Sequence, residues 1–299
     1  METESDPTVQ RQLVRMELKK ARDEAQMKQA EVAAAMDWSP SKLIRIESGQ
    51  VGISTNDLRQ LLSHYGVEDR QKVNDLIDRA KSSRGPSNYE QYADVLAPGF
   101  KAYLGYETSV SVIRHYDLVV FSGLLQTEEY ARAVITHVAG RGSDQAAKGW
   151  EVRERRQRLH ERANPPEMFF IMDEAVLRRR VGRQAHVMRH QLERVKVFAA
   201  QPHIRIQIIP FEQGAHPGLA GNFTLLEFKN PSLDGMVYLE SHGNLLLRDE
   251  ADTIARYGDR FQQLERLALP HEESVALLER LINEMASAES MNSTEQATS

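Results

Sequence analysis

The chain has 299 residues, of which 41% are hydrophobic and 27% are charged, so it is long enough for two domains with apolar cores. It has no cysteine, which excludes disulfides, zinc–thiolate and iron–sulfur sites and any thiol nucleophile. The net charge of −5 argues against a polyanion-binding surface that covers the whole chain. Since no apolar run approaches about 18 residues and the first residues are polar and acidic, we expect no membrane contact and a cytoplasmic location.

Residues 8–81 have the pattern of an all-α domain of about five helices. Amphipathic or alanine-rich segments predict helices over 8–25, 29–36, 40–48, 55–65 and 69–81. Gly49 is a suitable residue to end the third helix, and Ser54 with Asp57 has the spacing of an N-terminal cap for the fourth. The connections are too short for anything other than tight turns.

The second and third of these helices have the spacing of a helix-turn-helix pair. Val32, Met36, Leu43 and Ile46 would form one apolar cluster from both helices, and Ala33 would allow their close approach. The turn between them is Asp37-Trp38-Ser39, in which Asp37 has to adopt a left-handed backbone. Ser39 is placed to cap the third helix, and Pro40 suits its first position. Ser41, Lys42 and Arg45 would then face outward.

Residues 12–66 resemble the helix-turn-helix domain of phage-repressor-like, xenobiotic-response-element regulators of bacteria. The resemblance rests on the segments Leu18-Lys-Lys-Ala-Arg22, Gln29-Ala-Glu-Val-Ala33 and Ile46-Glu-Ser-Gly49, which stand in the family's order. It implies that Gln29 holds a DNA phosphate and that Arg22 pairs with Glu47. The sequence departs from the family at three positions, where Gln26 and Asp37 replace glycines and Lys28 replaces a capping threonine.

We therefore expect this domain to bind double-stranded DNA, with the third helix in the major groove. Residues 8–66 hold nine Lys or Arg and seven Asp or Glu, and a few well-placed cations are enough for salt-sensitive contacts. The predicted DNA-binding residues are Lys28, Gln29, Ser39, Ser41, Lys42 and Arg45. The alternative is a small helical bundle that binds no nucleic acid.

The composition changes after residue 81. Residues 82–88 are rich in turn formers and predict a linker, and residues 89–285 predict a mixed α+β domain. Strands are expected over 109–114, 167–172, 203–210, 222–228 and 236–240, and helices over 88–103, 127–139, 146–163, 183–200, 250–267 and 271–285. Residues 286–299 are small and polar, and we expect them to be a disordered tail.

The second domain has no catalytic signature that we can find. It lacks a P-loop, a nucleophile elbow and a zinc-protease motif. His186 and His190 are four residues apart, but no third metal ligand accompanies them, so no metal and no cofactor are predicted. An enzyme acting on a small molecule through residues 89–285 is the less favoured alternative.

Four stretches of the second domain resemble the uncharacterised C-terminal domain of many actinobacterial regulators, among them developmental regulators and antitoxin-like proteins. The stretches are 121–131, 208–218, 221–228 and 237–240, and the main departure is Ser122, where the family usually has proline. Two loops are candidate contacts for a ligand or partner, through Gly123, Gln126, Thr127 and His216. The alternative interpretation is that these residues determine the fold and contact no ligand or partner.

The sequence thus predicts a transcriptional regulator whose second domain dimerises and binds a ligand or partner. We expect a homodimer, because one helix-turn-helix covers one half-site. The leucines 264, 267, 277, 278 and 281 are predicted to supply the dimer surface. An antitoxin-like protein that chiefly holds a small toxin-like protein, encoded by a neighbouring gene, is the alternative that the resemblance leaves open.

Overall fold

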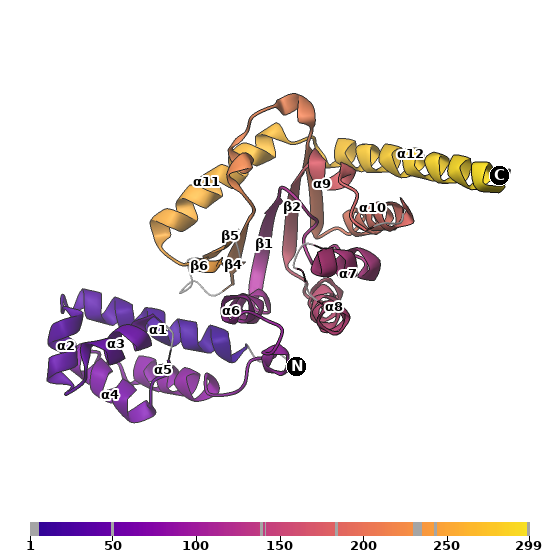
Figure 1. Cartoon of the computed structure of the whole chain (residues 1–299). Helices are drawn as coiled ribbons and strands as arrows, with labels where there is room; N and C mark the ends of the chain where they lie inside the picture. Colours follow the sequence, from indigo (N-terminus) through magenta and orange to yellow (C-terminus); the bar gives the residue numbers. More distant parts are fainter. Residues whose placement is uncertain are drawn as a thin grey trace. The chain divides into compact units, whose positions relative to one another are not determined.

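The protein is described by a computed structural model, which covers residues 6–48, 51–137, 140, 142–182, 185–229, 235–241 and 244–297 (Figure 1). Gly49, predicted to end the third helix, lies outside these residues. The chain divides into two compact units, which are described separately. The first comprises residues 1–91, 100–109 and 228–234, and the second the remainder.

Five helices build the first part of unit 1, as the sequence predicts. They are α1 (Pro7–Glu24), α2 (Gln29–Ala35), α3 (Pro40–Glu47), α4 (Thr55–His64) and α5 (Arg70–Ser82). Their core is a cluster of aliphatic side chains from all five helices, including Leu18, Val32, Leu43, Leu61 and Ile77. The caps follow the sequence, since the hydroxyl of Ser54 accepts the Asp57 N–H at 3.0 Å.

The sixth helix, α6 (Pro98–Glu107), largely belongs to unit 1, although it lies within residues 89–285, which the sequence predicts to form the second domain. Its Tyr106 hydroxyl donates to Gln12 Oε1 of α1 at 3.1 Å, and both side chains are buried. At Gly105 the two helices approach so closely that a Cβ atom would stand 2.7 Å from the Thr8 hydroxyl oxygen. Local pattern alone could not reveal this packing, because it joins segments far apart in sequence.

Unit 2 is built on a six-stranded mixed sheet with the strand order β3-β2-β1-β4-β5-β6. The strands are β1 (Val110–Asp117), β2 (Glu167–Asp173), β3 (Ile204–Ile209), β4 (Phe223–Phe228), β5 (Met236–Ser241) and β6 (Asn244–Arg248). The first three are parallel, with His115 level with Phe170 and Phe170 level with Ile206. Strands β4, β5 and β6 form an antiparallel meander. Strand β6 was not predicted.

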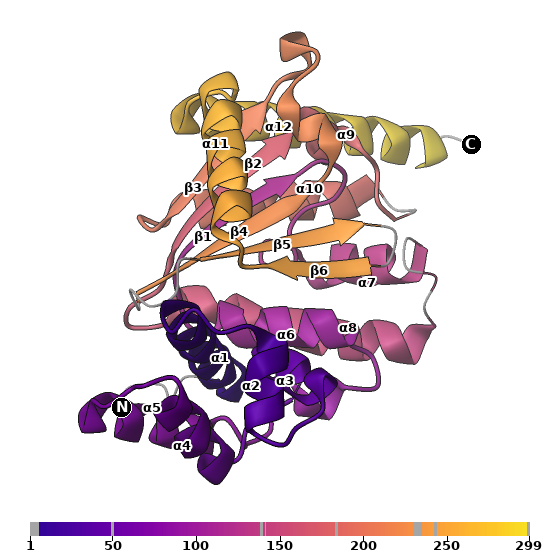
Figure 2. The ribbon, with the colours of Figure 1, turned by 90° about the vertical axis from the view of Figure 1, so that its left-hand side faces the viewer.

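Helices cover both faces of this sheet (Figures 1 and 2). The parallel crossovers carry α7 (Glu128–His137), α8 (Ser143–Gln157) and α10 (Ala185–Ala199), which lie on one face with α12 (His271–Ala297). Helix α11 (Ala251–Leu267) lies on the other face, where its Phe261 and Leu264 pack on Tyr116, Phe223 and Val237. Short helical segments complete the unit: η2 (Arg158–Glu161), α9 (Glu174–Arg178), η3 (Phe211–Gln213) and η4 (Pro217–Ala220). The segment η1 (Glu90–Tyr92) lies at the division of the chain, with Glu90 and Gln91 in unit 1.

The outer edge of β3 is closed by the connection between α11 and α12. The Leu269 N–H donates to the carbonyl of Ile208 at 2.8 Å, and the Ile208 N–H donates to Ser274 Oγ at 3.0 Å. An unpaired strand edge would invite pairing with another chain, so this segment protects it. Among the described residues, no helix combines the length and the low polarity that crossing a bilayer requires.

Two expectations for the end of the chain need correction. Helix α12 continues to Ala297, beyond the end expected at residue 285, so residues 286–297 are helical and do not form an irregular tail. Four of the five leucines predicted for a dimer surface lie in the chain's own core, since Leu264, Leu277, Leu278 and Leu281 are at most 5% exposed, whereas Leu267 is partly exposed. An amphipathic stripe shows that a face is buried, but not whether the same chain or a second copy covers it.

Candidate nucleic-acid interface

Helices α2 and α3 form a helix-turn-helix pair with a dry inner face. Val32, Ala33 and Leu43 have no exposed surface, and Ile46 is 4% exposed. Met36 and Trp38 cover the same cluster from its edge. Burial of α3 on one side leaves its opposite side to solvent, which is the arrangement of a helix that enters a DNA groove.

The backbone is left-handed at the two positions where the helix-turn-helix family that this domain resembles has glycine. Asp37 has φ of 54° in the α2–α3 turn, and Gln26 has φ of 56° before α2. Asp tolerates this conformation better than most side chains do. Ser39 occupies the cap position of α3, but its hydroxyl makes no capping hydrogen bond and lies 3.1 Å from the Ser41 hydroxyl. The cap expected from Ser39 is therefore wrong, although its position is right.

Arg22 and Glu47 lie together, as the resemblance implies. Arg22 Nε donates to Glu47 Oε1 at 2.7 Å, and Arg22 Nη2 donates to Glu47 Oε2 at 3.1 Å. The side chains are 11% and 4% exposed, and the hydrogen bond to Glu47 raises the pKa of Arg22. A two-point contact of this kind fixes the direction of both side chains. It ties α1 to the last residue of α3 and so sets the angle at which α3 is presented.

Gln29 takes part in the same cluster. Its amide donates to Glu47 Oε2 at 2.7 Å, so in the free protein it is held inward by a carboxylate. A phosphate contact by Gln29 would require this amide to turn. Lys28 is exposed, and its backbone N–H donates to Glu31 Oε2 at 3.1 Å. This is the contact that the glutamate of a capping box makes, so helix α2 keeps that half of the cap although Lys28 replaces threonine.

The outward face of α3 carries Ser41, Ile44, Arg45 and Ser48, all exposed. Arg45 forms no ion pair among the described residues. Ile44 is 48% exposed, and sequence reasoning missed it, because an apolar residue in an amphipathic helix is first assigned to the core. An aliphatic side chain at this place can contact the methyl group of thymine.

Lys42, in contrast, is engaged within the protein. Its Nζ lies 3.2 Å from Asp57 Oδ2 and 3.8 Å from the centre of the Trp38 ring. Both contacts come from segments outside α3, so helical spacing alone does not reveal them. Contact between Lys42 and a base would require the lysine to leave these partners.

The first candidate loop of unit 2 is held by internal hydrogen bonds. Gln126 is 2% exposed, donates to the carbonyl of Phe121 at 2.6 Å and accepts from Arg153 Nε at 2.9 Å. Thr127 Oγ1 accepts the Tyr130 N–H at 3.3 Å and so caps the start of α7. The carbonyl of Gly123 accepts from Gln157 at 3.0 Å. This geometry favours the interpretation that these residues determine the fold.

The second candidate loop is anchored at the carboxyl ends of β1 and β2. His216 Nε2 lies 3.2 Å from Asp173 Oδ2, and both side chains are buried.

At the end of β1, burial raises the pKa of Asp117 from 3.8 to about 7. Ser122, which replaces the family's proline, donates its N–H to Asp117 Oδ2 at 3.2 Å, a bond that proline could not make.

The histidine pair of α10 faces one carboxylate. His186 Nε2 and His190 Nδ1 lie 3.6 and 3.4 Å from the two carboxylate oxygens of Glu129. In the part of the chain that the structure describes, no group of three or more possible ligands is arranged to hold a metal ion.

Comparison with known families agrees with this division of the chain. Residues 14–76 match a family described as a helix-turn-helix domain, and residues 100–280, more than half of the chain, match a domain of unknown function, DUF5753. No curated protein matches the chain, and neither does any solved structure. The two matches support a DNA-binding regulator, and the chain belongs to the DUF5753 family, in a form that carries an N-terminal helix-turn-helix domain.

Proposed function

We propose that the protein is a sequence-specific transcriptional regulator that inserts α3 into the major groove of DNA. The observation that carries the proposal is the outward face of α3, where Arg45 has no ion pair among the described residues, while the opposite face is fully buried. A free guanidinium on such a helix is suited to the O6 and N7 acceptors of guanine. Ser41 lies one turn earlier and is available for a second polar contact.

The remaining contacts belong to the DNA backbone. Lys28 is exposed before α2, and we assign it to a phosphate. Gln29 is proposed to reach a phosphate after leaving Glu47, and Lys42 to strengthen binding after leaving Asp57. Because both residues have partners in the free protein, their net contributions should be smaller than those of Arg45 and Lys28.

We also propose that the protein acts as a homodimer and that unit 2 supplies dimerisation and ligand or partner binding. A single helix-turn-helix covers one half-site, so specific binding at ordinary salt concentrations calls for two copies. Leu264, Leu277, Leu278 and Leu281 do not provide this interface, since they are buried within the chain.

The experiment is selection of bound duplexes from a random library with the full chain, followed by titration of the selected duplex and of a shuffled duplex of the same composition. The function predicts enrichment of an inverted repeat and tighter binding to the selected duplex. Arg70→Ala is the matched control for Arg45→Ala, because Arg70 is exposed and lies at the start of α5 and not on α3. No enrichment, with equal binding to all duplexes, would contradict the proposal.

A further inference from the structure

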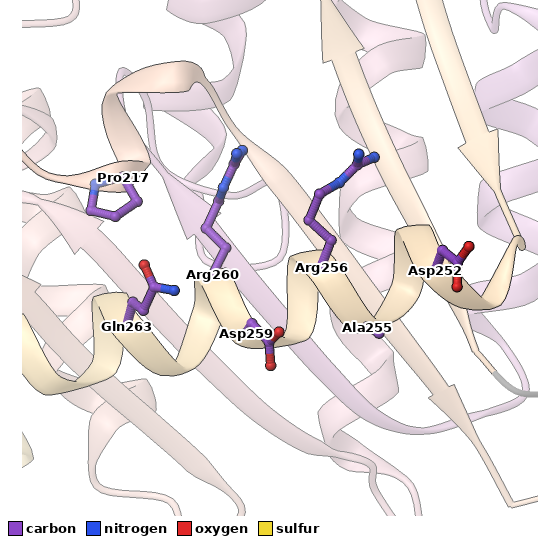
Figure 3. Close-up of a pocket in the computed structure, with 7 residues that line it drawn as sticks. All are labelled: Pro217, Asp252, Ala255, Arg256, Asp259, Arg260 and Gln263. Atoms are coloured by element: carbon purple, nitrogen blue, oxygen red, sulfur yellow. The ribbon is translucent and has the colours of Figure 1, made fainter.

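We propose that a groove between α11 and η4 in unit 2 binds a small molecule through a phosphate or carboxylate group. The groove encloses about 470 Å³ and is lined by Pro217 of η4 and by Asp252, Ala255, Arg256, Asp259, Arg260 and Gln263 of α11 (Figure 3). Pockets of a few hundred Å³ suit small ligands. The proposal rests on the proposed function in one respect only, namely that unit 2 binds a ligand, and it names the site of that binding.

The cationic wall is one side of α11. Arg256 and Arg260 are four residues apart and extend from the same side of the helix in Figure 3. Among the described residues neither forms an ion pair, and each guanidinium lies near the Tyr257 ring, at 5.8 and 5.0 Å from its centre. Two neighbouring guanidinium groups without carboxylate partners form a fork that matches the oxygens of a phosphate or carboxylate.

The tyrosine beneath them is fixed. The Tyr257 ring lies 5.0 Å from the Phe223 ring, and it packs on the core cluster that joins α11 to the sheet. Contact with a fixed aromatic ring limits the freedom of both arginines, so less entropy is lost when an anion binds.

The opposite wall is rigid because the loop that carries Pro217 is anchored on both sides of it. His216, one residue before, lies against Asp173, and its Nδ1 accepts the Gly218 N–H at 3.2 Å. Gly218, one residue after, lies so close to the Tyr116 ring that a Cβ atom would stand 2.3 Å from the hydroxyl oxygen. The groove is therefore a preformed feature of unit 2, and His216 contributes to it as a positioning residue.

The two aspartates limit what the groove accepts. Asp259 points away from the two arginines in Figure 3, and Asp252 lies at the end of the groove, one turn before Arg256. A carboxylate near a bound anion weakens binding by repulsion, and it can accept a hydrogen bond from a hydroxyl or ammonium group of the same ligand. This arrangement favours a compact anion over a long polyanion such as DNA.

The test is isothermal titration of the full chain with pyrophosphate and, separately, with citrate, at one fixed ionic strength. The two probes separate a phosphate from a carboxylate preference. Arg256→Gln and Arg260→Gln should each weaken binding about tenfold, as expected for the loss of a charge-assisted contact. Arg266→Gln is the matched control, because Arg266 is exposed on the same helix outside the groove. Asp259→Asn should tighten binding about twofold by removing repulsion.

Three outcomes would overturn the site: no heat of binding with either probe at millimolar concentration, an equal loss in Arg266→Gln, or no response to Arg256→Gln and Arg260→Gln. Unchanged melting temperatures of these variants ensure that a loss of binding is not a loss of folding. DNA titration of the same preparations separates this proposal from the proposed function. If the chain binds pyrophosphate but no specific duplex, the anion site is supported and the proposed DNA-binding function is contradicted. If it binds a specific duplex but neither probe, only the anion site is contradicted.

Discussion

The guanidinium of Arg22 in α1 and the carboxylate of Glu47 at the end of α3 form a two-point ion pair, at 2.7 and 3.1 Å. The same carboxylate accepts from Gln29 at 2.7 Å, so three helices meet at one buried acid. The orientation of α3 therefore depends on this ion pair. Breaking the pair is costly, because it would separate two nearly buried charges of opposite sign.

Glu47→Ala should therefore destabilise the N-terminal helices by about 3 kcal/mol, because it strands the Arg22 guanidinium. Glu31→Ala is the control, since Glu31 is exposed and only accepts the Lys28 N–H, a contact whose loss costs about 1 kcal/mol or less. Thermal melting of the two variants measures the difference. Equal melting temperatures would show that the pair contributes no more than a surface contact.

The N-terminal unit should need α6 for full stability. A fragment that ends at Ser87 lacks Tyr106, which is 7% exposed and donates to Gln12, whereas a fragment that ends at Ser109 retains it. We expect the longer fragment to melt at a higher temperature and to be monomeric, while the full chain is dimeric. Calorimetry and light scattering on both fragments provide the comparison. A shorter fragment of equal stability would show that α6 adds nothing to this unit.

Asp117 should make stability depend on pH. Its folded-state pKa, about 7, lies above the ordinary value of 3.8, so the folded protein retains a proton that the unfolded chain releases. The stabilisation is complete below pH 3.8 and is lost as pH rises to about 7, after which it is constant. The melting temperature of the wild type should thus fall relative to that of Asp117→Asn between pH 4 and 7. Asp78→Asn, at an exposed site, is the control, and parallel pH profiles for wild type and Asp117→Asn would contradict the assignment.

The exposed face of α3 predicts a second determinant of specificity. If Ile44 contacts a thymine methyl group, uracil in place of that thymine should weaken binding of the wild type and leave Ile44→Ala unaffected. One such apolar contact accounts for about 1 kcal/mol. The measurement is titration of the selected duplex with each thymine replaced in turn. Equal sensitivity of both proteins to every replacement would remove Ile44 from the interface.

Sequence reasoning found the parts of the fold that local pattern determines. Asp37 takes the left-handed turn, Val32 and Leu43 fill the core, and five of the strands lie where the sequence predicts them. Strand β6 was missed because Asn244-Leu-Leu-Leu-Arg248 has an apolar run of only three residues, which is equally compatible with part of a helix.

What the sequence could not show depends on contacts between distant segments. Lys42 meets Asp57, and Leu278 is covered by the chain's own sheet and helices and not by a second copy. Neither partner follows from spacing within one helix. The groove at Arg256 and Arg260 was missed for the same reason, since its second wall comes from η4.

Lys28 tests the phosphate contacts. Lys28→Ala should weaken binding to selected and shuffled duplexes alike, and it should reduce the dependence of log K on log salt by about one unit. Titrations at several salt concentrations give this slope. An unchanged slope would place Lys28 away from the phosphates.

The central claim is that Arg45 on α3 reads a base, and titration of Arg45→Ala against the selected and shuffled duplexes tests it most directly. The account predicts a loss of about 1–3 kcal/mol on the selected duplex and a clearly smaller loss on the shuffled one. Arg70→Ala, which removes the same charge elsewhere, should leave the ratio of the two affinities unchanged. An equal loss on both duplexes, or none on either, would contradict the claim.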